Sequence, residues 1–316
     1  MVGKWHLGNY KKDYTPTFRG FDSHYGYWEG MIEYYSHTLA FNNSVDGYDF
    51  RRNMEVEYDG VGTYATDLFT EESVKIINEH NPSKPLFLYL PHLATHVATF
   101  SENGVPLQAP DEDESRRKFA AMLWKLDESI GKVVEALKNR KMLKDSIIVF
   151  SADNGGSAGG YERSGASNWP LRGTKNSMWE GGVRGSAFIW SSLLKKPGRV
   201  SAEMMHISDW LPTLYNAIGG DLSDLHPTDG MNVWESLQGK SSSPRKEFVV
   251  NIDPIINGAS IRVKEWKLLF NPSDIGEQYD GWFGPSRRYY STNSNSYNEK
   301  ENRFLNIQNS PAGRAV

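Results

Sequence analysis

The chain has 316 residues, contains no cysteine and carries a formal net charge of −4. The absence of cysteine excludes a disulfide scaffold, a zinc finger, an iron–sulfur cluster, a thiolate nucleophile and any catalytic group made by modifying a cysteine. The acidic balance argues against nucleic-acid binding, which needs a basic surface, and no stretch approaches the roughly 18 apolar residues of a membrane span.

The first half of the chain predicts an alternation of helices and strands. A helix is predicted over 64–80, followed by the continuous apolar run 85–91, which is typical of a strand buried on both faces. A second helix covers 111–137, with apolar residues recurring at three and four. The apolar run 146–152 then predicts another strand. The order strand, helix, strand predicts a βαβ crossover and an α/β fold with a mostly parallel sheet.

The second half begins with a loop rich in glycine and serine and changes character near residue 245. We expect a strand over 183–190 and a helix over 206–218. Two later runs, 248–252 and 261–270, predict an antiparallel pair.

The change of character predicts two domains. We expect an α/β domain over 1–245 and a partial antiparallel subdomain over 246–316, and the tail from Pro285 on has little periodicity. The start of the chain, from Met1, has no apolar segment of the kind found in a signal peptide.

Asp153 and Asn154 directly follow the predicted strand 146–152. Ligands of open parallel sheets bind beyond the carboxyl ends of strands, and carboxylate and amide oxygens suit Ca²⁺ or Mg²⁺. The dipeptide Asn154-Gly155 is equally typical of a simple turn. A metal site and a turn therefore remain open interpretations.

Several basic residues are candidates for binding an oxyanion. Lys4 and His6 lie two residues apart, so in extended backbone both side chains point the same way. Lys175 lies in a glycine-dense segment with Arg172 and Arg184, which are further candidates. The alternative for Lys4 and His6 is a surface lysine and a capping histidine. The alternative for Arg172 and Arg184 is that they form structural ion pairs with Glu180.

Two histidines, His92 and His96, follow the predicted strand 85–91, and either could act as a general acid. The alternative for each is a hydrogen-bonded structural histidine. Asn42 begins an Asn-Asn-Ser glycosylation sequon, a short pattern that is weak evidence of secretion.

An ordered set of motifs resembles the sulfatase family. The motifs are Val2–Gly8, Arg19–Asp22, Tyr34–His37, Asp153–Gly156, Asn168–Gly173, Trp179–Gly185 and His206–Leu214. The resemblance covers residues 1 to about 270, and the arylsulfatase B type (N-acetylgalactosamine-4-sulfatase) is the most similar branch. It implies an alkaline-phosphatase-like α/β fold, with helices flanking a mostly parallel sheet and an incomplete antiparallel C-terminal subdomain.

The resemblance also implies hydrolysis of sulfate esters, on glycosaminoglycan sugars or aryl sulfates, by a formylglycine nucleophile with Ca²⁺, in a lysosomal or secreted protein. It assigns roles to six residues by position. Lys4 and Lys175 would hold sulfate oxygens, His6 would lie beside the nucleophile and assist sulfate release, His96 would protonate the leaving alcohol, and Asp153 and Asn154 would bind Ca²⁺.

The chain departs from the family in its nucleophile and metal-binding segments. Formylglycine is made from Cys in a Cys-x-Pro-x-Arg segment, or from Ser in some bacterial members, and neither pattern occurs here. The upstream paired aspartates of the family's Ca²⁺ site are also missing, and Ala98 stands where the branch often has proline. We therefore expect a chain truncated at its N-terminus, inactive and poorly stable alone.

Two other functions remain. One is a pseudoenzyme that binds sulfated glycans or a partner through its lysines and histidines. The other is a phosphatase or phosphodiesterase of the same superfamily, which the set Lys4, His6 and Lys175 disfavours because those enzymes fill the equivalent space with metal ligands.

Overall fold

The structure is a computed structural model, and it describes residues 1–41, 45–96, 114–160, 163–272 and 277–284. The chain divides into two compact units, 1–146 and 147–316. The domain boundary expected near residue 245 stays a prediction. The sequon at Asn42, Ala98 and the tail from Pro285 lie outside the described residues.

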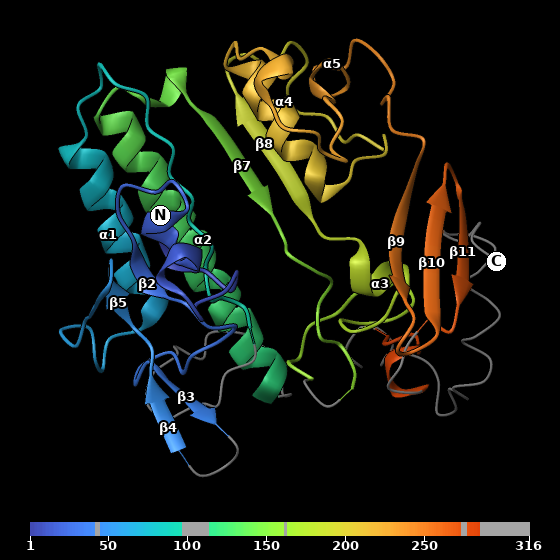
Figure 1. The fold of residues 1–316 in the computed structure, drawn as a ribbon, viewed down its shortest axis with the longest axis horizontal. Coiled ribbons are helices and arrows are strands. Elements are labelled where there is room, and N and C mark those ends of the chain that lie inside the picture. The colour runs from blue at the N-terminus through green and yellow to red at the C-terminus, as the bar shows by residue number, and fades with distance from the viewer. Residues whose placement is uncertain (42–44, 97–113, 161–162, 273–276, 285–316) are drawn as a thin grey trace, which may run out of the picture. The chain divides into compact units, whose positions relative to one another are not determined.

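A small mixed sheet forms the centre of the first unit (Figure 1). Its strand order is β1-β2-β5-β6; β1 and β2 are parallel, while β2–β5 and β5–β6 are antiparallel. The bounds are β1 Val2–Lys4, β2 Tyr25–Tyr27, β5 Arg51–Arg52 and β6 Glu55–Val56, with a separate hairpin of β3 Thr38–Phe41 and β4 Val45–Tyr48. The sheet described here is therefore mixed, where a mostly parallel one was expected.

The predicted strand 85–91 runs beside β1 without forming a regular strand of its own. The Val2 N–H donates to the Tyr89 carbonyl at 2.9 Å and the Lys4 N–H donates to the Pro91 carbonyl at 2.8 Å, so the two segments are parallel. The prediction that this segment is buried on both faces was wrong, because side-chain exposure alternates along it and Phe87 is 73% exposed.

Close backbone approach explains two glycines in this sheet. A Cβ on Gly3 would lie 2.1 Å from the Pro91 carbonyl oxygen, and one on Gly26 would lie 2.2 Å from the Gly3 oxygen. Both glycines also have positive φ, which side chains disfavour. Only glycine fits where these three segments meet.

The two long helices of the first unit are confirmed. They are α1, Ala65–Glu79, and α2, Glu114–Asn139, and they pack against each other. Their buried faces join the sheet in one core that includes Phe69 of α1 and Met122 of α2. Leu123 was expected on the buried stripe of α2 but is 49% exposed.

The second unit contains an antiparallel pair, β7 Ile147–Ser151 with β8 Ala187–Ser191. Both strands were predicted, and among the described residues β7 pairs with β8 alone. The parallel crossover expected between 85–91 and β7 stays a prediction. Apolar periodicity identifies a strand without identifying its partner. The first residue of the predicted strand 183–190, Val183, is instead the last residue of a short helix, α3 Glu180–Val183, and the strand begins at Ala187.

The predicted helix over 206–218 appears as a 3₁₀ turn, Ile207–Asp209, continued by α4, Trp210–Ala217, and a short helix α5, Trp234–Leu237, follows. Further 3₁₀ turns are Lys12–Tyr14, Pro16–Phe18, Leu143–Asp145, Leu222–Asp224 and Glu277–Tyr279.

The predicted antiparallel sheet near the C-terminus is confirmed, with three strands instead of two. They are β9 Glu247–Asp253, β10 Gly258–Val263 and β11 Trp266–Phe270, in the order β11-β10-β9 (Figure 1). The run 261–270 divides at Lys264, whose positive φ of 52° forms a turn. Among the described residues, every helix is too short or too polar to span a lipid bilayer.

Candidate active site

The candidate residues of the first unit follow neighbouring parallel segments. The segment ending at Pro91, β1 and β2 lie side by side and run the same way, so their carboxyl ends share one edge. Lys4 ends β1, His6 follows it, and His96 follows Pro91. All three residues thus follow the carboxyl ends of neighbouring parallel segments, which is where ligands of open parallel sheets bind.

His6 leaves the regular strand. The N–H groups of Trp5 and His6 donate to the Tyr27 and Trp28 carbonyls, each at 2.9 Å, although successive residues of a strand alternate between neighbours. His6 is exposed and has a positive φ of 52°. The expectation that Lys4 and His6 point the same way rested on extended backbone, and that backbone ends before His6.

His92 and His96 occupy different environments. The His92 Nε2 lies 3.2 Å from the Ser129 hydroxyl, and its Nδ1 is buried with no hydrogen bond. Burial lowers the pKa of His92 from 6.5 to about 4, because a charged ring would be desolvated. His96 is half-buried, and its N–H donates to the Leu93 carbonyl at 2.9 Å. These contacts fit the structural alternative for His92, and His96 stays the candidate acid.

The candidate metal ligands of the second unit lie directly after β7. Asp153 is exposed and Asn154 is half-buried, and the Asn154 side chain donates to the Gly155 carbonyl at 2.8 Å. A Cβ on Gly155 would lie 1.8 Å from the Gly181 oxygen. The Gly155 N–H donates to the Gly182 carbonyl at 2.8 Å. Glycines therefore allow the segment of α3 to support this turn closely.

Hydrogen bonds join the same turn to the segment carrying Lys175. The Gly156 carbonyl accepts the Lys175 N–H at 3.2 Å and the Thr174 hydroxyl at 2.9 Å. Asn168 accepts the Gly156 N–H at 2.8 Å and donates to the Gly156 carbonyl at 2.7 Å. These hydrogen bonds hold Lys175 and the Asp153–Asn154 turn in one loop region.

Two charged residues near Lys175, Arg172 and Glu180, make structural contacts that the sequence did not predict. The Arg172 guanidinium lies over the rings of Trp179 and Trp282, 3.8 and 4.7 Å from their centroids. Glu180 pairs with Arg262 and Lys267 of the C-terminal sheet, each at 2.8 Å.

The donor set at Asp153 and Asn154 suits Ca²⁺ in chemistry but not in number. Ca²⁺ takes six to eight oxygen ligands, and these side chains offer a carboxylate and an amide oxygen. Among the residues that the structure describes, no group of three or more His, Cys, Asp or Glu could hold a metal ion. A complete site would need further ligands.

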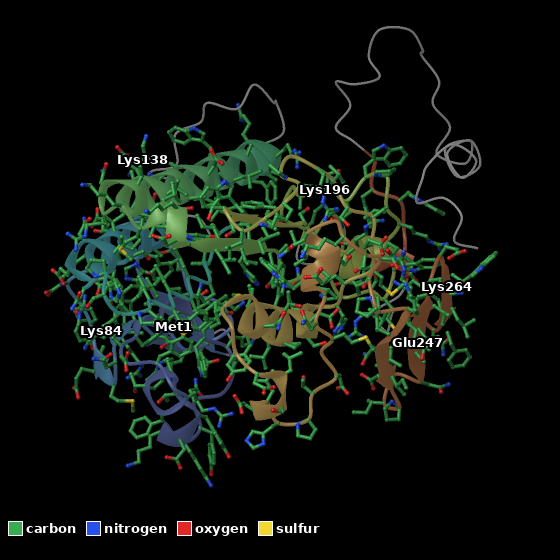
Figure 2. The ribbon with its side chains drawn as sticks, turned by 90° about the horizontal axis from the view of Figure 1, so that it is seen from above. Met1, Lys84, Lys138, Lys196, Glu247 and Lys264 are labelled. Carbon is green, nitrogen blue, oxygen red and sulfur yellow. The ribbon has the colours of Figure 1, made fainter. Side chains whose placement is uncertain are left out.

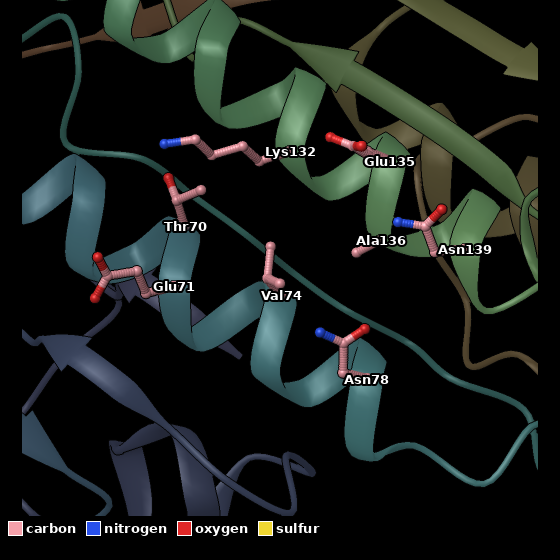
Figure 3. A pocket seen from close by; sticks show the side chains of 8 residues that line it. All are labelled: Thr70, Glu71, Val74, Asn78, Lys132, Glu135, Ala136 and Asn139. Atoms are coloured by element: carbon pink, nitrogen blue, oxygen red, sulfur yellow. The ribbon is translucent and has the colours of Figure 1, made fainter.

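A hollow between α1 and α2 lies apart from the candidate residues (Figure 3). Its volume is about 250 Å³. It is lined by Thr70, Glu71, Val74, Asn78, Lys132, Glu135, Ala136 and Asn139.

The sequence did not point to Gly30 or Tyr34 as residues of the site. Gly30 lies against the His6 ring, and the Tyr34 hydroxyl contacts the His96 carbonyl. Tyr34 begins one of the motifs of the resemblance, so its position was a signal. No local pattern pointed to Gly30, because its contact is with a residue 24 positions earlier.

Comparison with known proteins gives one family. The protein-family model described as Sulfatase matches residues 1–220 of this chain. Arylsulfatase J of Mus musculus is 40% identical over 314 residues, covering 90% of this chain and 50% of that protein. N-acetylgalactosamine-6-sulfatase of Homo sapiens is 26% identical over 257 residues, covering 76% of this chain and 46% of that protein.

Solved structures agree. The crystal structure of Ps i-CgsB in complex with k-i-k-neocarrahexaose has a TM-score of 0.70 and 27% identity, covering 85% of this chain and 61% of that one. The PsFucS1 sulfatase from Pseudoalteromonas sp. has a TM-score of 0.62 at 22% identity, covering 85% of this chain and 57% of that one, and supports the fold alone. The predicted alkaline-phosphatase-like α/β fold is confirmed.

The chain spans about half the length of the curated relatives it matches. The family match nevertheless covers well over half of these 316 residues. The chain belongs to the sulfatase family.

Proposed function

We propose that this chain carries the sulfate-binding and acid–base residues of a sulfuric ester hydrolase of the arylsulfatase B type, acting on sulfated sugars of glycosaminoglycans. The observation that carries the proposal is the placement of Lys4, His6 and His96 at one sheet edge within a family match. A relative named N-acetylgalactosamine-6-sulfatase supports a sulfated sugar as substrate.

In this proposal each residue acts through simple charge and proton chemistry. The ammonium groups of Lys4 and Lys175 hold sulfate oxygens and stabilise the charge that develops on them. His96 donates a proton to the oxygen of the leaving alcohol, and His6 moves a proton during release of sulfate.

Two groups beyond these side chains complete the chemistry. Asp153 and Asn154 would hold Ca²⁺ together with ligands supplied from elsewhere, and the bound ion would neutralise charge on the sulfate oxygens. A formylglycine would supply the nucleophile, and the 316 residues contain no cysteine and no Cys-x-Pro-x-Arg segment to form it.

The purified chain, supplied with Ca²⁺ and an aryl sulfate, is expected to release no sulfate above the rate of the buffer. The physical reason is that these 316 residues contain no segment of the kind that forms formylglycine, and binding groups alone do not cleave the ester. The measurement is free sulfate by ion chromatography over several days. Turnover that disappears in a His96→Gln variant would show that the nucleophile assignment is wrong.

Replacing Lys4 or Lys175 by Ala is expected to weaken binding of a chondroitin 4-sulfate hexasaccharide about tenfold. A charge-assisted hydrogen bond contributes roughly 1.5–3 kcal/mol, and about 1.4 kcal/mol corresponds to a factor of ten. Isothermal titration calorimetry in Ca²⁺ buffer measures the dissociation constants.

The matched control for the lysine variants is Lys138→Ala, an exposed lysine on α2 (Figure 2), which should leave the affinity unchanged. The desulfated hexasaccharide should bind equally weakly to all variants. The double variant Lys4→Ala with Lys175→Ala tests whether both lysines bind the same sulfate, since coupled losses indicate a shared sulfate. If the sulfated hexasaccharide binds equally well to the unsubstituted chain and to all the variants, the proposal is contradicted.

The alternative is a pseudoenzyme that binds sulfated glycans without cleaving them. The genomic sequence upstream of Met1 separates the two: a Cys-x-Pro-x-Arg segment with an Asp pair supports the enzyme. We also propose a lysosomal or secreted protein, with 1–245 as the catalytic domain and 246–316 as a C-terminal subdomain.

A further inference from the structure

We propose that the loop of residues 28–34 is a positioning element for both candidate acid–base histidines. Gly30 forms the surface on which the His6 ring lies, and Tyr34 holds the turn that carries His96. The inference rests on the proposed function, because that function gives both histidines a role.

The His6 ring lies against the one residue of the loop that has no side chain. A Cβ on Gly30 would lie 2.8 Å from the His6 Nε2 and 2.9 Å from its Cε1. The backbone φ of Gly30 lies outside the positive region, so the contact with the ring is what calls for glycine. The Trp28 carbonyl, two residues earlier, accepts the His6 N–H at 2.9 Å. The loop thus contacts both the backbone and the ring of His6.

A buried carboxylate fixes the start of the loop. The Asp49 side chain is almost fully buried, and its Oδ2 accepts the N–H groups of Trp28 at 2.9 Å and Glu29 at 2.8 Å. Arg51 lies 3.5 Å from the other carboxylate oxygen of Asp49 and places its guanidinium 4.0 Å from the centroid of a Trp28 ring. The backbone leading to Gly30 therefore has a fixed course.

Tyr34, at the end of the loop, holds the second histidine. Its hydroxyl lies 3.2 Å from the His96 carbonyl and 3.3 Å from the Leu93 carbonyl, so its one proton is shared by both ends of the turn. The ring is 1% exposed and stacks on Tyr64 with centroids 5.0 Å apart. Tyr34 therefore ties the backbone of His96 to the core.

One loop consequently sets where both imidazoles lie along the shared sheet edge. A displacement of about 1 Å in a reacting group can cost roughly 100-fold in rate. Gly30 and Tyr34 would act through His6 and His96, without contacting the substrate themselves.

The first test is Gly30→Ala in the full chain, with ¹⁵N-labelled histidine observed by NMR. The added methyl should push the His6 ring aside, since the ring is the end of a side chain on an exposed residue. We expect the His6 ring signals, assigned by their loss in His6→Gln, to shift while those of His24 and His37 stay in place. Unchanged His6 signals would overturn the Gly30 assignment.

The matched control is Gly131→Ala, a glycine of α2 whose added Cβ would have no neighbour within 4 Å. It should move no histidine signal. If it shifts His6 as much as Gly30→Ala does, the effect is general and the positioning role fails.

The second test is Tyr34→Phe, which keeps the ring and removes the hydroxyl. We expect the His96 ring signals to shift and those of His6 to stay in place, whereas Tyr58→Phe, at a residue 64% exposed, should move neither. Unchanged His96 signals would overturn the Tyr34 assignment. If Tyr34→Phe does not fold, Gly30→Ala still decides the loop's role for His6.

A ligand titration separates this inference from the proposed function. In the unsubstituted chain, the chondroitin 4-sulfate hexasaccharide should shift the His6 and His96 signals, and Gly30→Ala should reduce its affinity about tenfold at an unchanged unfolding midpoint. Absence of any binding by the unsubstituted chain would contradict the proposed function, and normal affinity in Gly30→Ala would contradict the positioning role.

Discussion

Replacing Asp209 by Asn is expected to lower the free energy of unfolding of the second unit by about 3–5 kcal/mol. Asp209 is fully buried, and its carboxylate accepts from the Arg245 Nε at 2.7 Å and from a second guanidinium nitrogen at 2.5 Å. It also accepts the N–H groups of His206 at 2.8 Å and Met231 at 2.7 Å. The substitution leaves the charge of Arg245, itself 6% exposed, without its counter-charge.

Urea unfolding followed by tryptophan fluorescence measures this loss. The matched control is Glu235→Gln, which removes an ion pair with Lys240 whose side chains are 57% and 46% exposed. Exposed pairs contribute about 0–1 kcal/mol, so the control should shift the midpoint little. If both variants lower the free energy of unfolding by the same small amount, the Asp209–Arg245 ion pair does not stabilise the second unit as its geometry indicates.

Lowering the pH from 7 to 4 is expected to destabilise the first unit by on the order of 3 kcal/mol for each of two histidines. Burial lowers the pKa of His24 and of His92 from 6.5 to about 4, because both rings would lose hydration of their charged form. A folded pKa below the unfolded one means that the unfolded chain binds protons first. The stability is therefore complete above pH 6.5 and is lost as the pH falls towards 4.

The measurement is the urea midpoint of the chain between pH 4 and 8. His92→Gln should flatten the pH dependence in this range, while His226→Gln, at an exposed position, should leave it unchanged. A pH dependence that is identical in all three proteins would show that His92 does not cause it. The result also bears on the proposed compartment, since an acidic lysosome would weaken the first unit more than the cell exterior would.

Much of the fold followed from apolar periodicity. The stripes of α1, α2 and α4 and the continuous runs of β7 and β9 are long enough for a pattern to repeat, so their positions were predictable. The strands of the first 60 residues, β1 to β6, have two to four residues each, too few for a period to appear. Strand partners were equally hidden, because β7 reads the same beside a parallel or an antiparallel neighbour.

The candidate site divides in the same way. The sequence by itself determined the family and the six candidate residues, because motifs such as Val2–Gly8 and Asp153–Gly156 are local and occur in a fixed order. Only the tertiary structure decided that the Nδ1 of His92 is buried, that His6 lies outside the regular strand, that Gly30 lies against the His6 ring and that the Tyr34 hydroxyl donates to the His96 carbonyl. These contacts join segments far apart in the chain, and close packing, which no local pattern encodes, selects them.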